Sequence, residues 1–541
     1  MNKSVALLAL TSLSLSSCIK EKETRPNILL ILADDMGYSD LGCFGGEMNT
    51  YNLDRLAHNG VRFTQFYNTA RCCPSRASLM TGLYPHESGV GYMSDLNVSP
   101  GYRGYLNDSC ATIAEVLGDA GYFTAMVGKW HIGSLKKAWP ENRGFQKFFG
   151  IHHWIDSYYG VLDDSEIYED GRMVIPVTDN PELYAENGKE WYTTDVFTTK
   201  AMEYMDEAQA EGKPFFQYLA YNAPHWPLHA PKEVVEKYIG MYKNGYEALR
   251  KQKYEQMIQT GIISSDWELP PQTTPDWENL SEDDRETLDF YRAIYAAQIE
   301  VLDQNIGRIV EHLKEKGMLD NTVIIFLSDN GCSAEPMNSD FGFYWNKNRK
   351  GNYDEWRKSP SRKGGSQGRV WSVTSNTPFR KNKRFTHEGG ISAPLIVYWP
   401  DGITNTDRIN NKASHLVDIM ATCVDLGKAQ YPESVKPMRG ISLVPDLRGK
   451  ESLPHDYIFW EHEGHGALRN AKWKIVNLHA KDATSWELYD MEKDRTEMHD
   501  LSDKYPEIRQ QMIKKWTEMA YDTNVLPWPD WSTKTYNPVE K

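Results

Sequence analysis

Residues 27–35 read Asn-Ile-Leu-Leu-Ile-Leu-Ala-Asp-Asp, an unbroken apolar run that stops at two adjacent carboxylates. A short apolar run without alternation is typical of a strand buried on both faces, as in parallel sheets. The same arrangement recurs at Phe123–Val127, Phe215–Ala220 and Val323–Leu327, each of which runs into polar residues. Ligands bind beyond the carboxyl ends of the strands in open α/β sheets. The four polar ends are therefore expected to build one site.

The stretches between these runs have helical spacing, which favours βαβ units. A long crossover helix is expected at about Arg285–Lys316, a further strand at Leu395–Trp399, and a long loop at Ser333–Asn376. From about Pro432 short alternating strands take over, with a helix near Ile508–Met519. The predicted fold class is α/β: a large mixed, mostly parallel sheet sandwiched by helices, plus a small antiparallel C-terminal subdomain with a helix.

Length and charge narrow the possible functions. The chain of 541 residues suits one large domain, placed at 26–431, and a smaller subdomain at 432–541. The net charge is −15 and the sequence pI is near 5.5, so the protein's field repels polyanions at long range and argues against a nucleic-acid partner. A local basic pocket for an anionic substrate remains compatible with this charge.

The first seventeen residues have the composition of a signal peptide. Lys3 precedes an apolar run, Val5–Leu15, that is too short to cross a bilayer. The run ends in Leu15-Ser16-Ser17-Cys18, which resembles a bacterial lipobox, and residues 18–25 form a charged tether. We expect an exported lipoprotein of the bacterial cell envelope, facing the periplasm or the cell surface and anchored to the membrane through Cys18. A plain cleaved signal peptide is the alternative.

The strongest local motif is Cys72-Cys73-Pro74-Ser75-Arg76, followed by Thr81-Gly82. Pro74 and Ser75 suit the start of a helix and Gly82 suits its end. Cys72 is therefore placed at a helix N-terminus, where free backbone N–H groups attract an anion and Arg76 adds a fixed cation.

This motif, Cys-x-Pro-Ser-Arg-x-x-x-x-Thr-Gly, resembles the signature of the type I sulfatases, which belong to the alkaline-phosphatase-like superfamily. The chain looks most similar to bacterial arylsulfatase-like members. The resemblance implies that a maturation enzyme oxidises Cys72 to formylglycine (3-oxoalanine), while Cys73 falls at a variable position. It also implies hydrolysis of sulfate esters by a formylglycine nucleophile through a covalent sulfate–enzyme intermediate.

The resemblance also implies a metal site. Asp34-Asp35 and Asp329-Asn330 look like the family's two ligand pairs, which bind Ca²⁺ together with an oxygen on residue 72. Hard oxygen donors without paired thiolates suit Ca²⁺ better than zinc. Taken alone, each acidic pair is also common in solvated loops.

Further catalytic residues follow the family pattern in order along the chain. In Gly128-Lys129-Trp130-His131, which resembles a family block, Lys129 would hold the formylglycine hydroxyl and His131 would act as the base. His225, in protonated form, and Lys383 resemble the sulfate-binding residues and would protonate the departing alcohol. Arg76 completes the set of cations around the sulfate.

A sulfated carbohydrate is the expected substrate, because a sugar alcohol needs proton donation to leave. Two segments are expected at the rim of the site and supply candidate contacts, of which His153, Trp154, His462 and His465 are the main ones; His152, Asp156 and Glu461 lie beside them. The alternatives are an arylsulfatase, a phosphate or phosphonate monoester hydrolase of the same superfamily, and a glycan-binding lipoprotein on an inactive scaffold.

Overall fold

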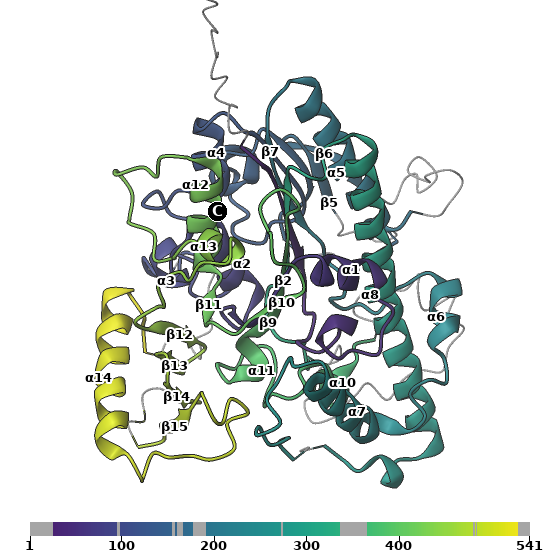
Figure 1. Ribbon diagram of the computed structural model, residues 1–541, viewed down its shortest axis with the longest axis vertical. Helices are drawn as coiled ribbons and strands as arrows, with labels where there is room; N and C mark the ends of the chain where they lie inside the picture. Colours follow the sequence, from purple (N-terminus) through teal and green to yellow (C-terminus); the bar gives the residue numbers. More distant parts are fainter. Residues whose placement is uncertain are drawn as a thin grey trace, which may run out of the picture.

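The computed structural model describes residues 25–527 except 95–97, 154–156, 160–165, 177–190, 272–273, 336–364, 480–481 and 483. Its centre is an 11-stranded sheet with the order β10-β2-β9-β8-β1-β7-β3-β4-β5-β6, to which β11 adds beside β2 (Figure 1). The strands are β1 (Asn27–Ala33), β2 (Val61–Tyr67), β3 (Phe123–Lys129), β4 (Lys147–Ile151), β5 (Glu166–Glu169), β6 (Arg172–Pro176), β7 (Phe215–Ala220), β8 (Thr322–Ser328), β9 (Ser392–Tyr398), β10 (Arg408–Asn410) and β11 (Ser414–His415).

The predicted mostly parallel sheet is confirmed. The central strands β8, β1, β7, β3 and β4 are parallel neighbours, and antiparallel β9 joins this group to β2. Strand β2 was not predicted.

Side chains of the central strands alternate between two cores. In β1, Leu29 and Ile31 enter the core on one face, and Leu30 and Leu32 enter the core on the other. The first core is covered by α1 (Tyr51–His58), α5 (Thr193–Ala210) and α8 (Glu282–Glu315), and the second by α2 (Cys72–Thr81), α4 (Ile113–Asp119) and α12 (Val417–Gly427), so Figure 1 shows helices on both sides of the sheet. The remaining helices include α6 (Lys232–Tyr238), α7 (Gly245–Gln259), α10 (Gly368–Ser375) and α11 (Glu388–Ile391).

Helix α8 is the crossover helix expected before β8. It begins three residues earlier than predicted, because the Ser281 hydroxyl accepts from the Asp284 N–H at 3.1 Å and caps the helix. Three carboxylates in the first turn complement the helix dipole. The long loop expected at 333–376 is wrong in its last part, which forms α10 and buries Val370 and Trp371 in the core.

The C-terminal subdomain is an antiparallel sheet, β12 (Ile458–His462), β13 (His465–Arg469), β14 (Trp473–Asn477) and β15 (Glu487–Asp490), covered by α14 (Pro506–Asp522) (Figure 1). One face packs on Met512 and Trp516 of α14. The other face packs on Tyr67 of β2 and Ile391 of α11, and so joins the subdomain to the main sheet.

Four fully buried charges lie at this junction. Lys474 of β14 binds Glu388 and Glu497, each at 2.8 Å, and Arg495 binds Glu388 at 2.8 Å. We call these four residues the junction cluster. They tie α11, which follows Lys383 in the chain, to the subdomain.

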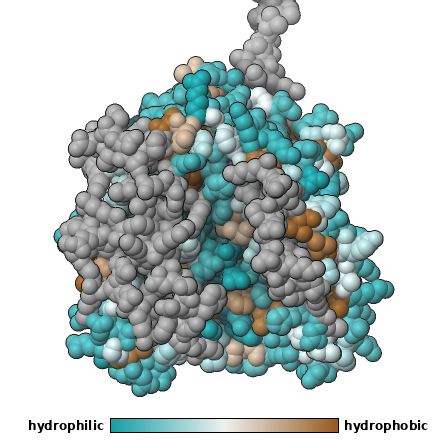
Figure 2. Space-filling view, turned by 180° about the vertical axis from the view of Figure 1, so that it is seen from behind, coloured by the Kyte–Doolittle hydropathy of each residue, from teal (hydrophilic) through white to brown (hydrophobic). Residues whose placement is uncertain are grey.

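On the face seen in Figure 2, the coloured residues are largely hydrophilic, with hydrophobic side chains in small groups. Within the described ranges, no helix is both long enough and apolar enough to cross a bilayer. The six described cysteines are all buried as free thiols. Cys18 and the predicted leader lie outside the described residues.

Candidate active site

Four neighbouring strands deliver polar side chains to one edge of the sheet. Asp34 and Asp35 follow β1, Lys129 ends β3, and Asp329 follows β8, while the loop after β7 carries His225. The prediction that these strand ends meet is therefore confirmed. Gly128 allows the close packing here, because a Cβ at this position would stand 2.0 Å from the Ala220 carbonyl oxygen.

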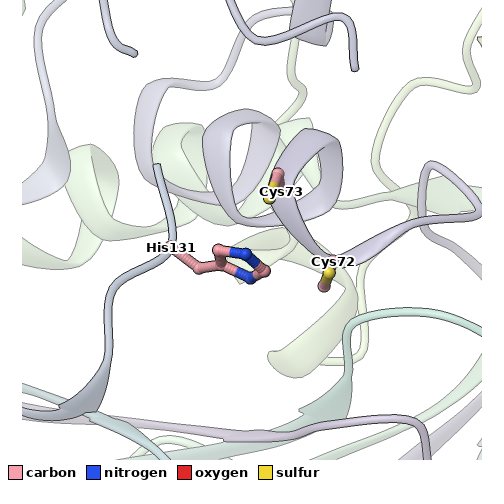
Figure 3. Close-up of side chains that lie close together, drawn as sticks. All are labelled: Cys72, Cys73 and His131. Atoms are coloured by element: carbon pink, nitrogen blue, oxygen red, sulfur yellow. The ribbon is translucent and has the colours of Figure 1, made fainter. Parts of the chain in front are cut away.

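Helix α2 brings Cys72 to the same edge. Cys72 is the first residue of the helix and Gly82 ends it in the left-handed conformation, with φ of 68°, as the sequence predicted. The His131 ring is directed at Cys72 and lies beside the first turn of α2 (Figure 3). The side chain of Cys72 is only 2% exposed, so the site is deep.

The surroundings of Cys72 favour a negative charge. A hydrogen bond with the Cys73 thiol lowers the pKa of Cys72 well below its ordinary value; burial opposes this effect, and His131, Lys129 and Lys383 add to it. Burial lowers the pKa of His131 to about 4, so its imidazole is neutral at pH 7. A neutral imidazole beside residue 72 can accept a proton, as predicted for the base.

The backbone carries strain at two of these positions. Asp35 has φ of 65° and His131 has φ of 59°, both in the left-handed region that residues with a Cβ rarely adopt. Such conformations persist only where the surrounding structure enforces them, and they cluster at functional sites.

The two predicted metal-ligand pairs converge. The amide of Asn330 donates to Asp35 Oδ1 at 2.6 Å, and the Asp35 N–H donates to Asp329 Oδ1 at 3.2 Å. Asp34 Oδ1 and Asn330 Oδ1 are both buried without any hydrogen-bond donor among the described residues. Orphaned buried oxygens are rare in proteins, and here they come from the residue types that Ca²⁺ prefers. The donor set therefore fits a hard cation.

Cations surround these carboxylates. Lys129 Nζ lies 2.5 Å from Asp34 Oδ2, and Arg76 holds Asp329 Oδ2 through Nε at 3.1 Å and Nη2 at 2.9 Å. Burial raises the pKa of Asp34, but the charges of Lys129, His225 and Arg76 outweigh it and hold the pKa below its ordinary value. Arg76 lies 3.4 Å from Asp34 as well, and thus bridges two strand ends.

Lys383 and His225 form the predicted pair. Lys383 Nζ lies 3.4 Å from His225 Nε2 and 2.8 Å from Asp35 Oδ1. Burial lowers the pKa of His225, whereas Asp35 and Glu335 overcome burial and raise the pKa of Lys383. These shifts favour a charged Lys383, whereas burial works against the protonated form of His225 that the sequence analysis expected.

A cavity of about 1210 Å³ adjoins the site and is lined by Arg71, Lys383, Glu335 and Trp226 among others. His465 of β13 also lines it; its Nδ1 lies 2.7 Å from the Leu478 carbonyl and its ring stacks on Phe385. The C-terminal subdomain therefore contributes to the cavity wall.

Other expected rim residues lie elsewhere. His462 is fully buried with its ring stacked on Tyr92, and His152 is buried against Trp139, so their predicted rim positions are wrong. Glu461 is buried and binds His86 at 2.8 Å. His153 is exposed, whereas Trp154 and Asp156 lie outside the described residues.

Sequence reasoning missed several cavity residues. Arg71 and Glu335 pair at 2.6 Å beside Lys383. The basic run Arg380–Arg384 was a usable signal, since four of its five residues are cationic and it contains Lys383. Arg250 in α7 gave no local signal.

The chain is similar to known proteins over most of its length. A family model described as Sulfatase matches residues 26–429, and one described as N-sulphoglucosamine sulphohydrolase, C-terminal, matches 380–522. An arylsulfatase of Klebsiella aerogenes is 32% identical over 82% of this chain and 96% of its own. An N-acetylglucosamine-6-O-sulfatase of Bacteroides thetaiotaomicron is 28% identical over 92% of this chain and 87% of its own. The solved structure of Ps i-CgsB in complex with k-i-k-neocarrahexaose is 25% identical with a TM-score of 0.67, covering 92% of this chain and 94% of that one.

Proposed function

Because the chain belongs to the sulfatase family of sulfuric ester hydrolases, we propose that it removes sulfate from glycans with a formylglycine made from Cys72 and with a bound Ca²⁺. The observation that carries this proposal is the convergence of several groups at one sheet edge. They are Cys72, the buried cations, and the Asp34 Oδ1 and Asn330 Oδ1 atoms that lack a hydrogen-bond donor. A sulfate ester is an anion, so a nucleophile approaches it only where several positive charges surround it.

Each residue of the site has a distinct role in the proposed reaction. Asp34, Asp35, Asp329 and Asn330 would hold Ca²⁺, which would supply charge stabilisation to the sulfate oxygens. Residue 72, once oxidised to formylglycine and hydrated, would offer one hydroxyl as the nucleophile toward sulfur as the bond to the alcohol oxygen breaks, and loss of a proton from its second hydroxyl would re-form the aldehyde and release sulfate. Lys129 and Arg76 stand beside these groups to hold charge, His131 takes a proton at residue 72, and Lys383 with His225 delivers one to the leaving alcohol.

A sugar sulfate is the substrate class that the site fits best. A phenol leaves readily without a proton, whereas a sugar alcohol needs the Lys383–His225 pair. Three relatives support this choice by name: the N-acetylglucosamine-6-O-sulfatase, the human N-acetylgalactosamine-6-sulfatase, and the oligosaccharide-bound solved structure. The arylsulfatase relative, which has the higher identity to this chain, favours aryl sulfates as the second candidate.

Two further proposals concern the maturation and the localisation of the protein. We propose that a maturation enzyme oxidises Cys72, and that Cys18 carries lipid and anchors an exported protein to the cell envelope. Both rest on the sequence motifs. Cys18→Ala should release the protein from the membrane fraction without lowering the activity of the catalytic domain.

The proposed chemistry is tested by mass spectrometry and turnover of Cys72→Ala and Cys73→Ala, each co-expressed with a maturation enzyme. The peptide should carry the aldehyde at residue 72, and Cys72→Ala should lose essentially all turnover while Cys73→Ala keeps most of it. The substrates should include a sulfated sugar, an aryl sulfate and the phosphate ester of the same sugar. Turnover of the phosphate ester alone would instead support a phosphatase of the same superfamily.

A further inference from the structure

The cavity beside the site has a basic wall in a strongly acidic chain. Its described lining holds Lys383 and six further cations: Arg71, Arg250, Arg369, Arg380, Lys381 and Arg384. Two carboxylates, Glu335 and Glu497, are the acidic residues of the same described lining. The whole chain has a net charge of −15, so this wall opposes the overall field.

The acidic groups near the wall already have partners. Glu335 pairs with Arg71 at 2.6 Å, and Glu497 pairs with Lys474 at 2.8 Å behind the wall. Arg384 is held by Glu463 through Nε at 2.8 Å, and Arg380 lies 3.9 Å from Glu487. The remaining positive charge of the wall is therefore not cancelled by these carboxylates.

Arg250 of α7 is the clearest uncompensated cation. Its side chain is buried, its Nη1 donates to the Pro270 carbonyl at 2.5 Å, and its Nε is buried without an acceptor. No carboxylate pairs with Arg250 among the described residues, and burial lowers its pKa to about 10. A buried cation without a counter-charge is costly and is expected to serve a ligand.

Lys381 adds a second cation on the same wall. Its Nζ lies 5.2 Å from the centre of the Phe385 ring, and no described carboxylate pairs with it. Burial lowers the pKa of Lys381, and repulsion from Arg380 and Arg369 lowers it further. An anion bound here would relieve this repulsion.

We propose that Arg250 and Lys381 form a second anion subsite, which binds an additional sulfate or carboxylate of the glycan while its ester sulfate lies at Cys72. The subsite rests on the proposed function and narrows its substrate class to multiply charged glycans. A guanidinium binds a sulfate or carboxylate through paired N–H groups. Trp226 and Phe385 also line this cavity and supply apolar surface for the sugar units between the two anions.

The test compares four sulfate esters: 4-nitrophenyl sulfate, and three trisaccharides that share one ester sulfate and carry a second sulfate, a carboxylate or a hydroxyl at the distal unit. Wild-type kcat/KM should be highest for a trisaccharide with a second anion. Whichever of the sulfate and carboxylate trisaccharides has the higher kcat/KM identifies the anionic group that the subsite binds. Arg250→Gln should lower that kcat/KM about tenfold more than kcat/KM for 4-nitrophenyl sulfate, since a charge-assisted contact is lost. Lys381→Gln should act in the same direction.

The control is Lys251→Gln, which removes the same charge from the neighbouring position of α7. The side chain of Lys251 is 74% exposed and lies outside the cavity lining, so all four esters should keep their wild-type ratios. Arg250→Lys should restore part of the preference if charge is the cause. Circular dichroism and thermal unfolding verify that each variant folds.

A binding measurement separates this inference from the proposed chemistry. Cys72→Ala, which cannot turn over, should bind the doubly anionic trisaccharide more tightly than the singly sulfated one, and the difference should shrink in high salt. Equal affinity for both in Cys72→Ala, or equal losses on all esters in Arg250→Gln, overturns the subsite. Wild-type enzyme that turns over none of the esters overturns the proposed function instead.

Discussion

Among the described residues, two buried clusters of charge differ: the one at the candidate active site is incomplete, whereas the one at the junction with the C-terminal subdomain is fully paired. The site cluster contains Asp34, Asp35, Asp329, Arg76, Lys129 and Lys383, and the junction cluster contains Glu388, Glu497, Lys474 and Arg495. Both are almost entirely shielded from water. Both have equal numbers of acidic and basic side chains.

The clusters differ in how fully their polar atoms are paired. In the junction cluster, Glu388 accepts from Lys474, Arg495, Tyr67 and Ser392, and the second oxygen of Glu497 accepts from a backbone N–H. In the site cluster, Asp34 Oδ1 remains without a donor, as does Asn330 Oδ1 beside it, and Asp35 has a strained backbone. A fully paired network supports the fold, whereas unpaired buried atoms indicate a place kept for a ligand.

The largest effect expected from this comparison is on catalysis. Asp34→Asn keeps the size of the side chain but removes one carboxylate of the proposed metal site, so kcat/KM should fall by about a thousandfold or more. The free energy of unfolding should also fall, by about 3 kcal/mol, because buried Lys129 loses its counter-charge, so activity is compared per folded molecule. Urea unfolding measured beside sulfate release tests both halves. A folded, active Asp34→Asn enzyme, or full wild-type activity after prolonged chelation, would contradict the metal site.

The junction cluster should affect stability but not activity. Glu388→Gln leaves Lys474 and Arg495 buried with less counter-charge, so the free energy of unfolding should fall by about 3 kcal/mol. Activity per folded molecule should stay within about twofold, because Glu388 does not contact the site cluster. Glu487→Gln is the matched control: its 3.9 Å pair with Arg380 is partly exposed and should contribute less than about 1 kcal/mol. A larger loss of unfolding free energy in Glu487→Gln than in Glu388→Gln would contradict the comparison.

A smaller effect should appear in both regions in acid. His229 lies on the loop after β7 and His415 lies in β11 at the junction, and burial lowers the pKa of each to about 3; His455 adds to the effect at His415. The unfolded chain binds these protons near pH 6.5, so the stability due to each neutral ring is complete above pH 6.5 and is lost as the pH falls toward 3. Each ring should lower the free energy of unfolding by about 2 kcal/mol at pH 5 relative to its value above pH 6.5.

Urea unfolding at pH 7.5 and pH 5.0 measures this loss. His415→Gln and His229→Gln should each lose less stability than the wild type between the two values. An unchanged pH dependence in both variants would show that neither ring is the group that titrates.

The parts of the site that were predictable depend on local patterns. The run 27–35 defines a strand and its carboxylates within nine residues, and Cys72 with Gly82 marks both ends of one helix. Strand β2 was missed because it buries Arg62 among its apolar residues and pairs with β9, which is far away in the sequence. The function of Glu388 could not be predicted, because its partner Lys474 is 86 positions away.

Long-range packing also explains the failed rim prediction. His462 resembles an exposed ligand-binding residue in sequence, but the ring of Tyr92 covers it. Arg250 is the reverse case, since an arginine in an ordinary helical stretch becomes a buried cation only after α7 packs beside Pro270. Burial of a polar side chain is a property of the assembled fold and leaves no trace in its neighbours along the chain.

The burial of α2 has a consequence for biosynthesis. All ten residues of this helix are buried, and Asp329, which Arg76 binds, is synthesised 253 positions later. An enzyme that oxidises the thiol of residue 72 would therefore have to act before that later segment packs over the helix. The fraction of active molecules would then depend mainly on the timing of translation and export. The affinity of the modifying enzyme for the folded domain would matter less.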